Sequence, residues 1–238
     1  MMRKRTRWVV RGLIAAILVP ALFVAVRWGS GNYGTVVSGR IYRSAQPSAS
    51  GLTRALRRDG IKTVLNLRGA NPDQAWYRSE KASTLASGAT QVDFPMSSDQ
   101  WLSREQAAAL LDILDKSDYP ILIHCEWGAE RTGLIAAFCA MLRPGSGLDD
   151  GRREFSAYYM FLPIKDGLVM RAHIDAYASW LTARAERHSP ELLRRWLTRS
   201  YEPGKPSREH WPCNPYPLRI VTRPNDGART TWGATRCR

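Results

Sequence analysis

The residues of this 238-residue chain that are best suited to chemistry lie in one stretch, His124 to Gly133, which reads H-C-E-W-G-A-E-R-T-G. Cys125 offers a thiol nucleophile, and Arg131 follows it closely. This spacing lets the backbone between them curl into a ring of N–H donors, which can hold a dianion while the guanidinium binds two of its oxygens. Gly128 supplies the positive-φ freedom that such a ring needs. The pattern therefore predicts phosphate chemistry.

The flanking residues place this stretch at the start of a helix. Residues 119–123 read as a short buried strand, and residues 131–142 read as an apolar helix. The helix dipole and its unpaired N–H groups favour anions, including the thiolate form of Cys125. Thr132 can donate its hydroxyl to the sulfur, and His124 is expected to fix the loop through its ring hydrogen bonds. The predicted phosphate-binding residues are Glu126, Trp127, Gly128, Ala129, Glu130 and Arg131.

This stretch resembles the signature of the cysteine-dependent protein tyrosine and dual-specificity phosphatases, H-C-x2-G-x2-R-[S/T]-G, and each fixed position of the signature is present. The resemblance extends to residues 39–47 and 60–68, which are similar to the opening strands of compact atypical dual-specificity phosphatases. It covers residues 36–180. It implies an α/β fold with a central, mostly parallel sheet flanked by helices.

The hydrophobic pattern independently agrees with such a fold. Strands are predicted at 61–67, 90–96 and 120–125, alternating with helices at 50–59, 73–87 and 103–117. A capping box at Ser103 to Gln106 marks the start of the last of these helices. Further helices, packed beside the sheet, are predicted at 148–159, 168–188 and 189–200. Tyr158 is assigned to the core rather than to a substrate groove.

The resemblance also implies a proton donor for the leaving oxygen, because family enzymes use an aspartate on a loop upstream of the nucleophile. Asp99 lies in a polar loop between a predicted strand and the capped helix, and it is the predicted general acid. Asp93 is the competing candidate. It belongs to the alternating stretch 91–95 and is expected to be held within or beside the strand.

The implied reaction has two steps. The Cys125 thiolate attacks phosphorus, Arg131 and the loop N–H groups hold the oxygens, and Asp99 protonates the departing oxygen. Water activated by Asp99, with help from Thr132, then hydrolyses the cysteinyl-phosphate. No cofactor or metal is expected, since the histidines show no ligand spacing with one another or with the cysteines. These histidines are His124, His173, His188 and His210.

Two carboxylates within the loop bear on the substrate. Glu126 and Glu130 would repel additional phosphates, which favours a substrate with one phosphate on an uncharged or bulky group. Orientation of Arg131 by Glu130 is a structural alternative. Three functions remain open: a phosphomonoesterase of an envelope lipid or sugar phosphate, a phosphatase of phosphotyrosine or other phosphoproteins, and a non-catalytic phosphate-binding module.

The net charge of +14 belongs to the two ends of the chain. It divides as +6 in residues 1–30, +1 in 31–180 and +7 in 181–238. A nearly neutral centre without a recognition motif argues against nucleic-acid binding. We expect a basic and apolar N-terminal segment (1–30), a phosphatase domain (31–190) and a basic extension rich in Trp, Pro and Arg (191–238).

The N-terminal segment has the features of a membrane anchor. Residues 13–26 are uncharged and span about 21 Å of helix, short of a hydrocarbon core of about 30 Å. The stretch from Trp8 to Trp28 suffices if Arg11 and Arg27 extend toward the headgroups. We predict an uncleaved anchor, with a cleaved signal peptide as the alternative. The excess of basic residues before the apolar run predicts a single-pass inner-membrane protein whose domain faces the periplasm.

That location makes a membrane lipid or another envelope phosphate the favoured partner. Residues 29–34 read as a short flexible linker that keeps the site near the bilayer. Of the remaining cysteines, Cys139 is assigned to the core. Cys213 and Cys237 lie in the C-terminal extension, where an oxidising compartment would allow them to pair.

Overall fold

The structure is a computed structural model that describes residues 2–207, 218–224 and 229–232. Its strands form a seven-stranded sheet in the order β1-β2-β5-β3-β4-β6-β7. The strands are β1 (Gly34–Val37), β2 (Ile41–Ser44), β3 (Thr63–Asn66), β4 (Thr90–Asp93), β5 (Ile121–His124), β6 (Arg219–Thr222) and β7 (Arg229–Trp232). The central strands β2, β5, β3 and β4 run parallel, whereas β1, β6 and β7 pair antiparallel at the edges. The predicted α/β fold is confirmed, with a mixed sheet that is parallel at its centre.

The central strands have the burial expected of parallel strands covered on both faces. Every residue of β3 and of β5 is buried. The strands predicted at 61–67, 90–96 and 120–125 are confirmed as β3, β4 and β5, each a little shorter. The edge strands β6 and β7 lie where the sequence predicts no strand. Each has four residues, which is too short for alternation to stand out in a basic region.

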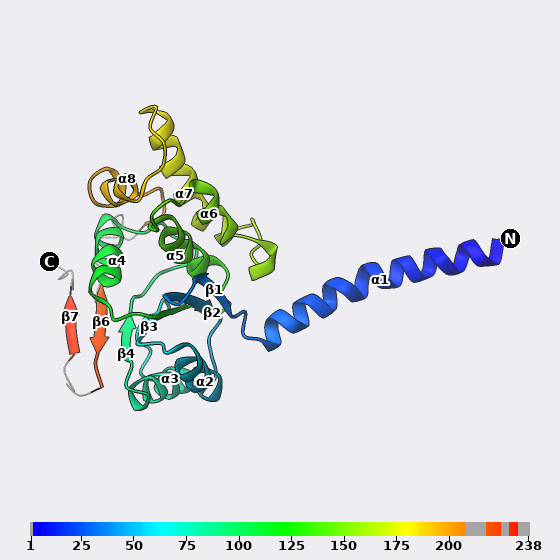
Figure 1. Ribbon diagram of the computed structural model, residues 1–238, viewed down its shortest axis with the longest axis horizontal. Helices are drawn as coiled ribbons and strands as arrows, with labels where there is room; N and C mark the ends of the chain where they lie inside the picture. Colours follow the sequence, from blue (N-terminus) through cyan, green and yellow to red (C-terminus); the bar gives the residue numbers. More distant parts are fainter. Residues whose placement is uncertain (1, 208–217, 225–228, 233–238) are drawn as a thin grey trace.

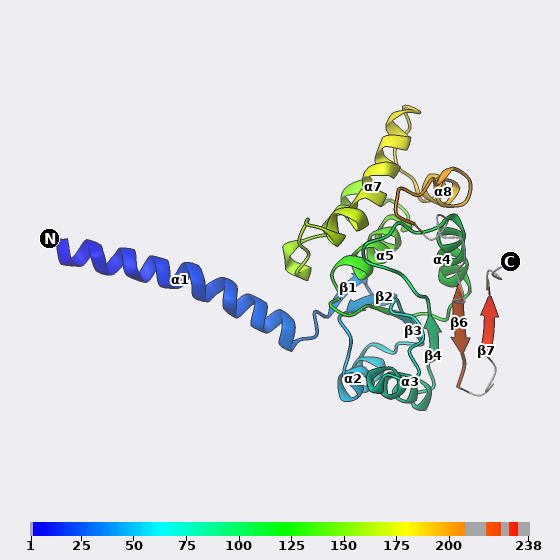
Figure 2. The same ribbon diagram turned by 180° about the vertical axis from the view of Figure 1, so that it is seen from behind.

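Helices cover both faces of the sheet, with α2 and α3 on one side and α4, α5 and the later helices on the other (Figures 1 and 2). The helices are α1 (Met2–Gly29), α2 (Ala49–Asp59), α3 (Ala75–Ala86), α4 (Arg104–Lys116), α5 (Glu130–Met141), α6 (Leu148–Arg153), α7 (Asp166–Thr182) and α8 (Pro190–Arg195). Short 3-10 and π turns follow α6 and α8 at Ala157–Tyr159 and Trp196–Ser200. The capping box at Ser103 is confirmed. The single helix predicted at 148–159 is wrong: α6 ends before Glu154, whose carbonyl and carboxylate both bind a buried arginine.

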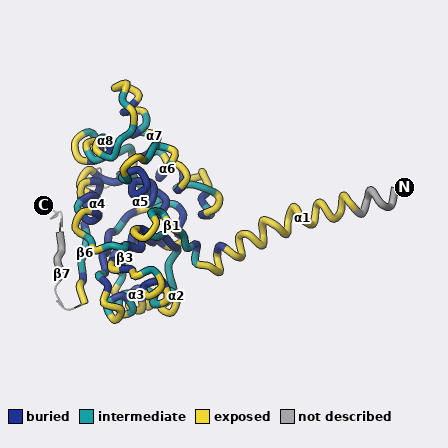
Figure 3. Tube along the Cα trace, in the orientation of Figure 1, coloured by how far each residue is buried: buried dark blue, intermediate teal, exposed yellow. Residues whose placement is uncertain are grey.

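The main hydrophobic core lies between the sheet and the layer of α4, α5 and α7, and the buried segments of Figure 3 trace it. A smaller cluster lies under α2 on the other face. Leu193 of α8, Trp196 and Leu197 of the π turn, and Tyr201 directly after it also belong to the main core. Trp196, Leu197 and Tyr201 are each at most 2% exposed. The first part of the predicted C-terminal extension therefore completes the core of the domain.

The N-terminal helix α1 projects away from the domain (Figures 1 and 2). Among the described helices, only α1 is long and apolar enough to cross a membrane. The apolar stretch Trp8–Gly29 has 22 residues, and its most apolar 18-residue window has a mean hydropathy of 2.5 and no buried residue. A membrane anchor and a signal sequence share this length and composition.

The junction between α1 and the domain differs from the prediction. Arg27, expected to extend toward headgroups, is only 6% exposed and donates to Asn32 Oδ1 at 2.7 Å and to Tyr33 O at 3.2 Å. Asn32, expected to lie in a flexible linker, is 1% exposed and donates to the carbonyls of Trp127 and Tyr159. Arg27 turns inward because the domain offers it acceptors that replace water. The end of α1 is thus fixed to the domain.

Candidate active site

The carboxyl ends of the parallel strands meet at one edge of the sheet. His124 of β5 pairs in register with Ser44 of β2 and Asn66 of β3, and Asn66 pairs with Asp93 of β4. Ligand sites of open α/β sheets lie at this edge. The stretch predicted to bind phosphate begins here, because Cys125 directly follows β5.

Residues 125–129 form a tight loop between β5 and α5, which we call the phosphate loop. Cys125 is 1% exposed, and the Gly128 N–H donates to its Sγ at 3.2 Å. Gly128 has a φ of +70°, which confirms the predicted need for glycine. A Cβ there would lie 2.5 Å from Ala45 N. Glycine is thus required both by the backbone conformation and by the close approach of the neighbouring chain.

A buried arginine that the sequence analysis missed holds this loop. Arg43 Nη2 donates to Gly128 O at 2.7 Å, and Nη1 donates to Glu154 Oε2 at 2.7 Å. The Arg43 side chain is fully buried, and its guanidinium lies 3.7 Å from the centre of the Tyr159 ring. Burial lowers the pKa of Arg43 and raises the pKa of Glu154. The pair therefore depends on its mutual charge and on its hydrogen bonds.

The buried His124 ring lies between two polar neighbours. Its Nε2 lies 3.2 Å from Glu80 Oε2, and its Nδ1 lies 3.3 Å from Cys125 O. Glu80 is buried and also accepts from the side-chain amides of Gln46 and Gln91. Burial raises the pKa of Glu80, but His124 and the amide donors outweigh it and hold the pKa below its usual value. This network supports the end of β5 from which the phosphate loop starts.

The two candidate acids occupy very different places. Asp93, the last residue of β4, is completely buried and accepts from Asn66 Nδ2 at 3.0 Å, Gln91 Nε2 at 3.2 Å and Tyr77 OH at 2.6 Å. Burial raises the pKa of Asp93. Asp99 is exposed on the loop that connects β4 to α4 and accepts from Ser97 Oγ. Asp93 thus ties strands together, whereas Asp99 is accessible.

A further aspartate, which the sequence analysis missed, reaches the loop of Asp99. Asp166, the first residue of α7, accepts from Ser98 Oγ at 2.7 Å. Arg131 contacts the same loop, because its Nη1 lies 3.4 Å from Met96 O. The loop between β4 and α4 is therefore joined both to the predicted phosphate-binding arginine and to a second carboxylate.

The remaining predicted residues surround the loop. Thr132 is buried, and its Oγ1 has no hydrogen-bond partner within the described part of the chain. Ala129 is buried, Glu130 is half-buried in the first turn of α5, and Glu126 and Trp127 are exposed. Glu126 Oε2 lies 3.9 Å from Arg68 Nη2. Arg68, also missed, directly follows the predicted strand 61–67, and its residue type alone gave no sign that it faces this loop.

Residues 23–155 match the model of the family described as "DSP-PTPase phosphatase fused to NAD+ Kinase". The chain belongs to this DSP-PTPase family. The dual specificity protein phosphatase TpbA of Pseudomonas aeruginosa (strain UCBPP-PA14) is 29% identical over 137 residues, which cover 51% of this chain and 59% of TpbA. The chain thus matches less than two thirds of that relative's length.

Solved structures of DSP-PTPase type resemble this chain as well. The crystal structure of P. aeruginosa TpbA is 25% identical and covers 62% of this chain and 89% of its own, with a TM-score of 0.48. The core catalytic domain of the PP-IP phosphatase SIW14 from S. cerevisiae, in complex with citrate, is 24% identical and covers 63% and 93%, also with a TM-score of 0.48.

The DSP-PTPase loop of this chain provides several groups suited to an anion. The Gly128 backbone amide faces the sulfur at the amino end of α5, where the helix dipole is positive. Arg131 and the unpartnered Thr132 hydroxyl lie in the first turn of that helix. No cluster of three or more His, Cys, Asp or Glu side chains is placed to hold a metal ion in the described ranges.

Proposed function

We propose that this DSP-PTPase is a cysteine-dependent phosphatase that hydrolyses a phosphomonoester through a cysteinyl-phosphate intermediate. The observation that carries the proposal is the Gly128 amide directed at Cys125 Sγ, 3.2 Å away, at the amino end of α5. The same amides that stabilise a thiolate can stabilise the equatorial oxygens of a phosphoryl group. Arg131 adds a bidentate donor for these oxygens.

The proposed reaction transfers the phosphoryl group to sulfur and then to water. Cys125 Sγ bonds to phosphorus as the bond to the leaving oxygen breaks, and Asp99 gives that oxygen its proton. Asp99 then takes a proton from the water that attacks the cysteinyl-phosphate. Thr132 Oγ1 has no other partner within the described residues, and we assign its hydroxyl to the departing sulfur. His124 supports the loop from the network of Glu80.

Asp99 is preferred as the acid because it is exposed on a loop that Arg131 touches through Met96. Asp93 is disfavoured, since its two oxygens already accept three hydrogen bonds inside the sheet. Asp166 is the competing acid, because its contact with Ser98 brings it to the same loop.

We further infer that α1 is an uncleaved anchor in the inner membrane and that the domain faces the periplasm. A signal sequence that is cleaved to release the domain into the periplasm is the alternative. The packing of the last turns of α1 supports the uncleaved anchor. Arg27 in these turns is buried and donates hydrogen bonds to Asn32 and Tyr33, at the start of the domain. The substrate is then an envelope lipid or sugar phosphate. Glu126 and Glu130 favour a substrate with a single phosphate.

A second candidate function is the hydrolysis of phosphoproteins. The name of the relative TpbA, a dual specificity protein phosphatase, favours it. Phosphotyrosine would present one phosphate on a bulky ring, which also satisfies the carboxylates of the loop. The two candidates differ in whether the phosphate is carried by an envelope lipid or sugar or by a peptide.

The chemistry is tested on the full chain reconstituted in lipid nanodiscs. Cys125→Ser should abolish hydrolysis of p-nitrophenyl phosphate while vanadate still binds, since the amides and Arg131 remain. Cys139→Ser is the matched control: Cys139 is buried in α5, and burial raises the pKa of its thiol far above the usual value. Turnover by the Cys125→Ser chain would refute the nucleophile. An inactive wild-type chain that binds vanadate would indicate a non-catalytic phosphate-binding module.

The substrate is tested by comparing kcat/KM for lipid phosphomonoesters in vesicles, sugar phosphates and phosphotyrosine peptides. Preference for vesicle lipids or sugar phosphates supports the envelope substrate. Preference for the peptides establishes the phosphoprotein function instead.

A further inference from the structure

The exposed apolar side chains of the domain are gathered in one area. Outside α1, the large hydrophobic residues that the described structure leaves exposed are Trp127, Tyr158, Leu162, Ile164 and Leu168, at 49 to 60% exposure. The assignment of Tyr158 to the core is therefore wrong. Together with Trp28 at the end of α1, which is 62% exposed, these residues form what we call the apolar rim. An exposed apolar group of this size marks a contact with a partner or a membrane.

The last turns of α1 pack against the apolar rim. The Trp28 and Trp127 rings meet edge to face with centroids 5.2 Å apart, and the Phe23 and Tyr158 rings lie 6.4 Å apart. The Arg27 guanidinium lies 4.3 Å from the centre of the Tyr158 ring. Figures 1 and 2 show the segment between α6 and α7 on the side of the domain from which α1 projects. The rim thus lies beside the point where α1 leaves the domain.

These contacts fix the depth of the rim relative to a membrane crossed by α1. Trp8 and Trp28 are separated by about 30 Å of helix, which equals the hydrocarbon thickness, and tryptophan prefers the two interfaces. Phe23 then lies about 7.5 Å inward from Trp28. Because Tyr158 packs on Phe23, Tyr158 must reach that depth, and the exposed apolar residues up to Leu168 follow it on the same segment. Segments that lie in the interface are buried by about 5–10 Å.

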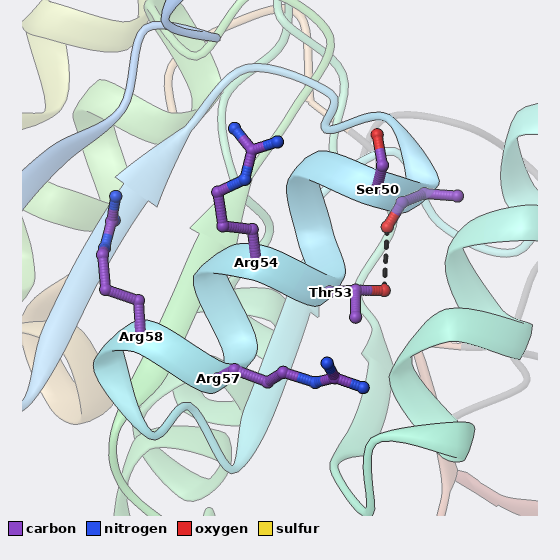
Figure 4. Close-up of a pocket in the computed structure, with 6 residues that line it drawn as sticks. Ser50, Thr53, Arg54, Arg57 and Arg58 are labelled. Atoms are coloured by element: carbon purple, nitrogen blue, oxygen red, sulfur yellow. Dashed lines mark hydrogen bonds between the residues drawn. The ribbon is translucent and has the colours of Figure 1, made fainter.

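Basic residues border the rim on the other side of α1. A cavity of about 660 Å³ separates the end of α1 from α2, and Trp28, Ser48 and Arg54 are among the residues that line it. Figure 4 shows Arg54 and Arg58 extending from one side of α2, with Arg57 nearby. Arg58 pairs with Asp59 at 2.6 Å. Arg54 and Arg57 have no acidic partner among the described residues, which suits them to anionic headgroups.

We propose that the apolar rim inserts into the bilayer interface while Arg54 and Arg57 meet anionic headgroups, so that the phosphate loop opens onto the membrane surface. This inference rests on the proposed anchoring by α1. A bilayer is the occupant because a partner protein on Tyr158 would have to lie at the level of the membrane-spanning Phe23. Trp127 belongs both to the rim and to the phosphate loop, which places a phosphate at headgroup level beside Cys125.

Spin labels test the docking without reference to activity. Nitroxides are placed at position 164 or 168 of the full chain in nanodiscs of anionic lipid, after replacement of Cys125, Cys213 and Cys237 by serine. Ala183 is the matched control, since it is exposed and lies about 22 Å along α7 from Leu168, the last residue of the rim. Labels at 164 and 168 should be accessible to oxygen and shielded from a water-soluble nickel chelate, whereas the label at 183 should show the reverse. Equal water access at all three positions overturns the proposal.

Kinetics provide a second test. Replacing Leu162, Ile164 and Leu168 together by serine should lower kcat/KM for phosphatidic acid in vesicles by about tenfold or more. Hydrolysis of soluble p-nitrophenyl phosphate should stay unchanged. Equal loss on both substrates overturns the proposal. A wild-type chain that hydrolyses neither substrate refutes the proposed function, and the spin-label depths then still decide whether the rim docks.

Discussion

Arg43 Nη2 lies 2.7 Å from the carbonyl oxygen of Gly128, so a buried side chain of β2 fixes the backbone of the phosphate loop. The other arm of the guanidinium is held by Glu154, through both its carboxylate and its carbonyl. Carbonyls of an anion-binding loop must point away from the anion, and a charged donor behind the loop stabilises that orientation. Arg43 is therefore a positioning residue, remote in sequence from the loop that it orients.

Replacement of Arg43 by Met should damage both folding and activity. Glu154 would remain buried without its cation, which costs about 3–5 kcal/mol of unfolding free energy. Gly128 O would also lose its donor, so kcat for p-nitrophenyl phosphate should fall. The double variant Arg43→Met with Glu154→Gln separates the effects: we expect it to regain stability in chemical denaturation but not kcat. Full recovery of kcat in the double variant would show that Arg43 serves folding alone.

Gly128→Ala should disable the phosphate loop. The new Cβ would meet Ser44 and Ala45 backbone atoms at 2.5 to 2.6 Å, so the loop must move and the amide would leave Cys125 Sγ. Loss of such a donor lowers kcat by about 10²–10³. Gly88→Ala is the matched control, because Gly88 has a φ of +74° with no atom near its Cβ position. It should cost only about 1–2 kcal/mol and leave kcat unchanged. Equal losses of activity in the two variants would contradict this account.

The phosphate loop could be predicted because its residues are contiguous and their types carry the chemistry. A single local turn of the backbone is enough to bring together Cys125, Gly128 and Arg131. Arg43 and Asn32 could not be predicted, because nothing in a single sequence distinguishes a buried arginine or asparagine from an exposed one. Their partners at Gly128 and Trp127 lie across the fold.

The fold shows the same contrast. Buried parallel strands such as β3 and β5 stand out as apolar runs, and the capped helix α4 carries its own start signal. The strands β6 and β7 depend on the pairing of β6 with β4 and of β7 with β6, and the contact with β4 is a tertiary one without a local pattern. The exposure of Tyr158 could not be predicted either, because nothing local distinguishes the two tyrosines of the 3-10 turn, of which Tyr158 is 54% exposed and Tyr159 only 8%.

Asp99→Asn should lower kcat by about 10²–10⁴ for a poor leaving group such as phenyl phosphate. The loss should be smaller for p-nitrophenyl phosphate, whose leaving oxygen needs less protonation. Asp166→Asn is the comparison, since Asp166 reaches the same loop through Ser98. The general acid would instead be Asp166 if the Asp166 variant lost more kcat for phenyl phosphate than for p-nitrophenyl phosphate and the Asp99 variant did not.

Asn32→Ala should loosen the attachment of α1 to the phosphate loop. Asn32 has a φ of +50° and donates to Trp127 O at 3.0 Å and to Tyr159 O at 2.9 Å. Asn32→Gly is the control that tolerates this φ but loses both hydrogen bonds. We expect both variants to raise hydrogen exchange of residues 126–129 in nanodiscs, with a further loss of stability only for Ala. Unchanged exchange in the Gly variant would show that the amide does not hold the loop.

His173 should make folding stability depend on pH. Its Nε2 accepts from Leu102 N at 3.1 Å, so Nδ1 carries the proton and faces Val169 O at 3.0 Å. The ring is completely buried, stacks on Trp101 and is therefore held in the neutral form. Burial lowers the pKa of His173 to about 4. An unfolded histidine titrates near pH 6.5.

The sign of the effect follows from which state binds the proton. Between about pH 6.5 and about pH 4 the unfolded chain takes up a proton that the folded His173 refuses, so the unfolding free energy falls as the pH falls, by about 3 kcal/mol in total. Above about pH 6.5 neither state is protonated, and this contribution is constant. His173→Gln removes the titration. Urea denaturation of the detergent-solubilised full chain should show wild type losing more stability than the variant between about pH 7 and about pH 5. His188 and the carboxylates are common to both chains and cancel in the difference, so parallel pH profiles would refute the assignment.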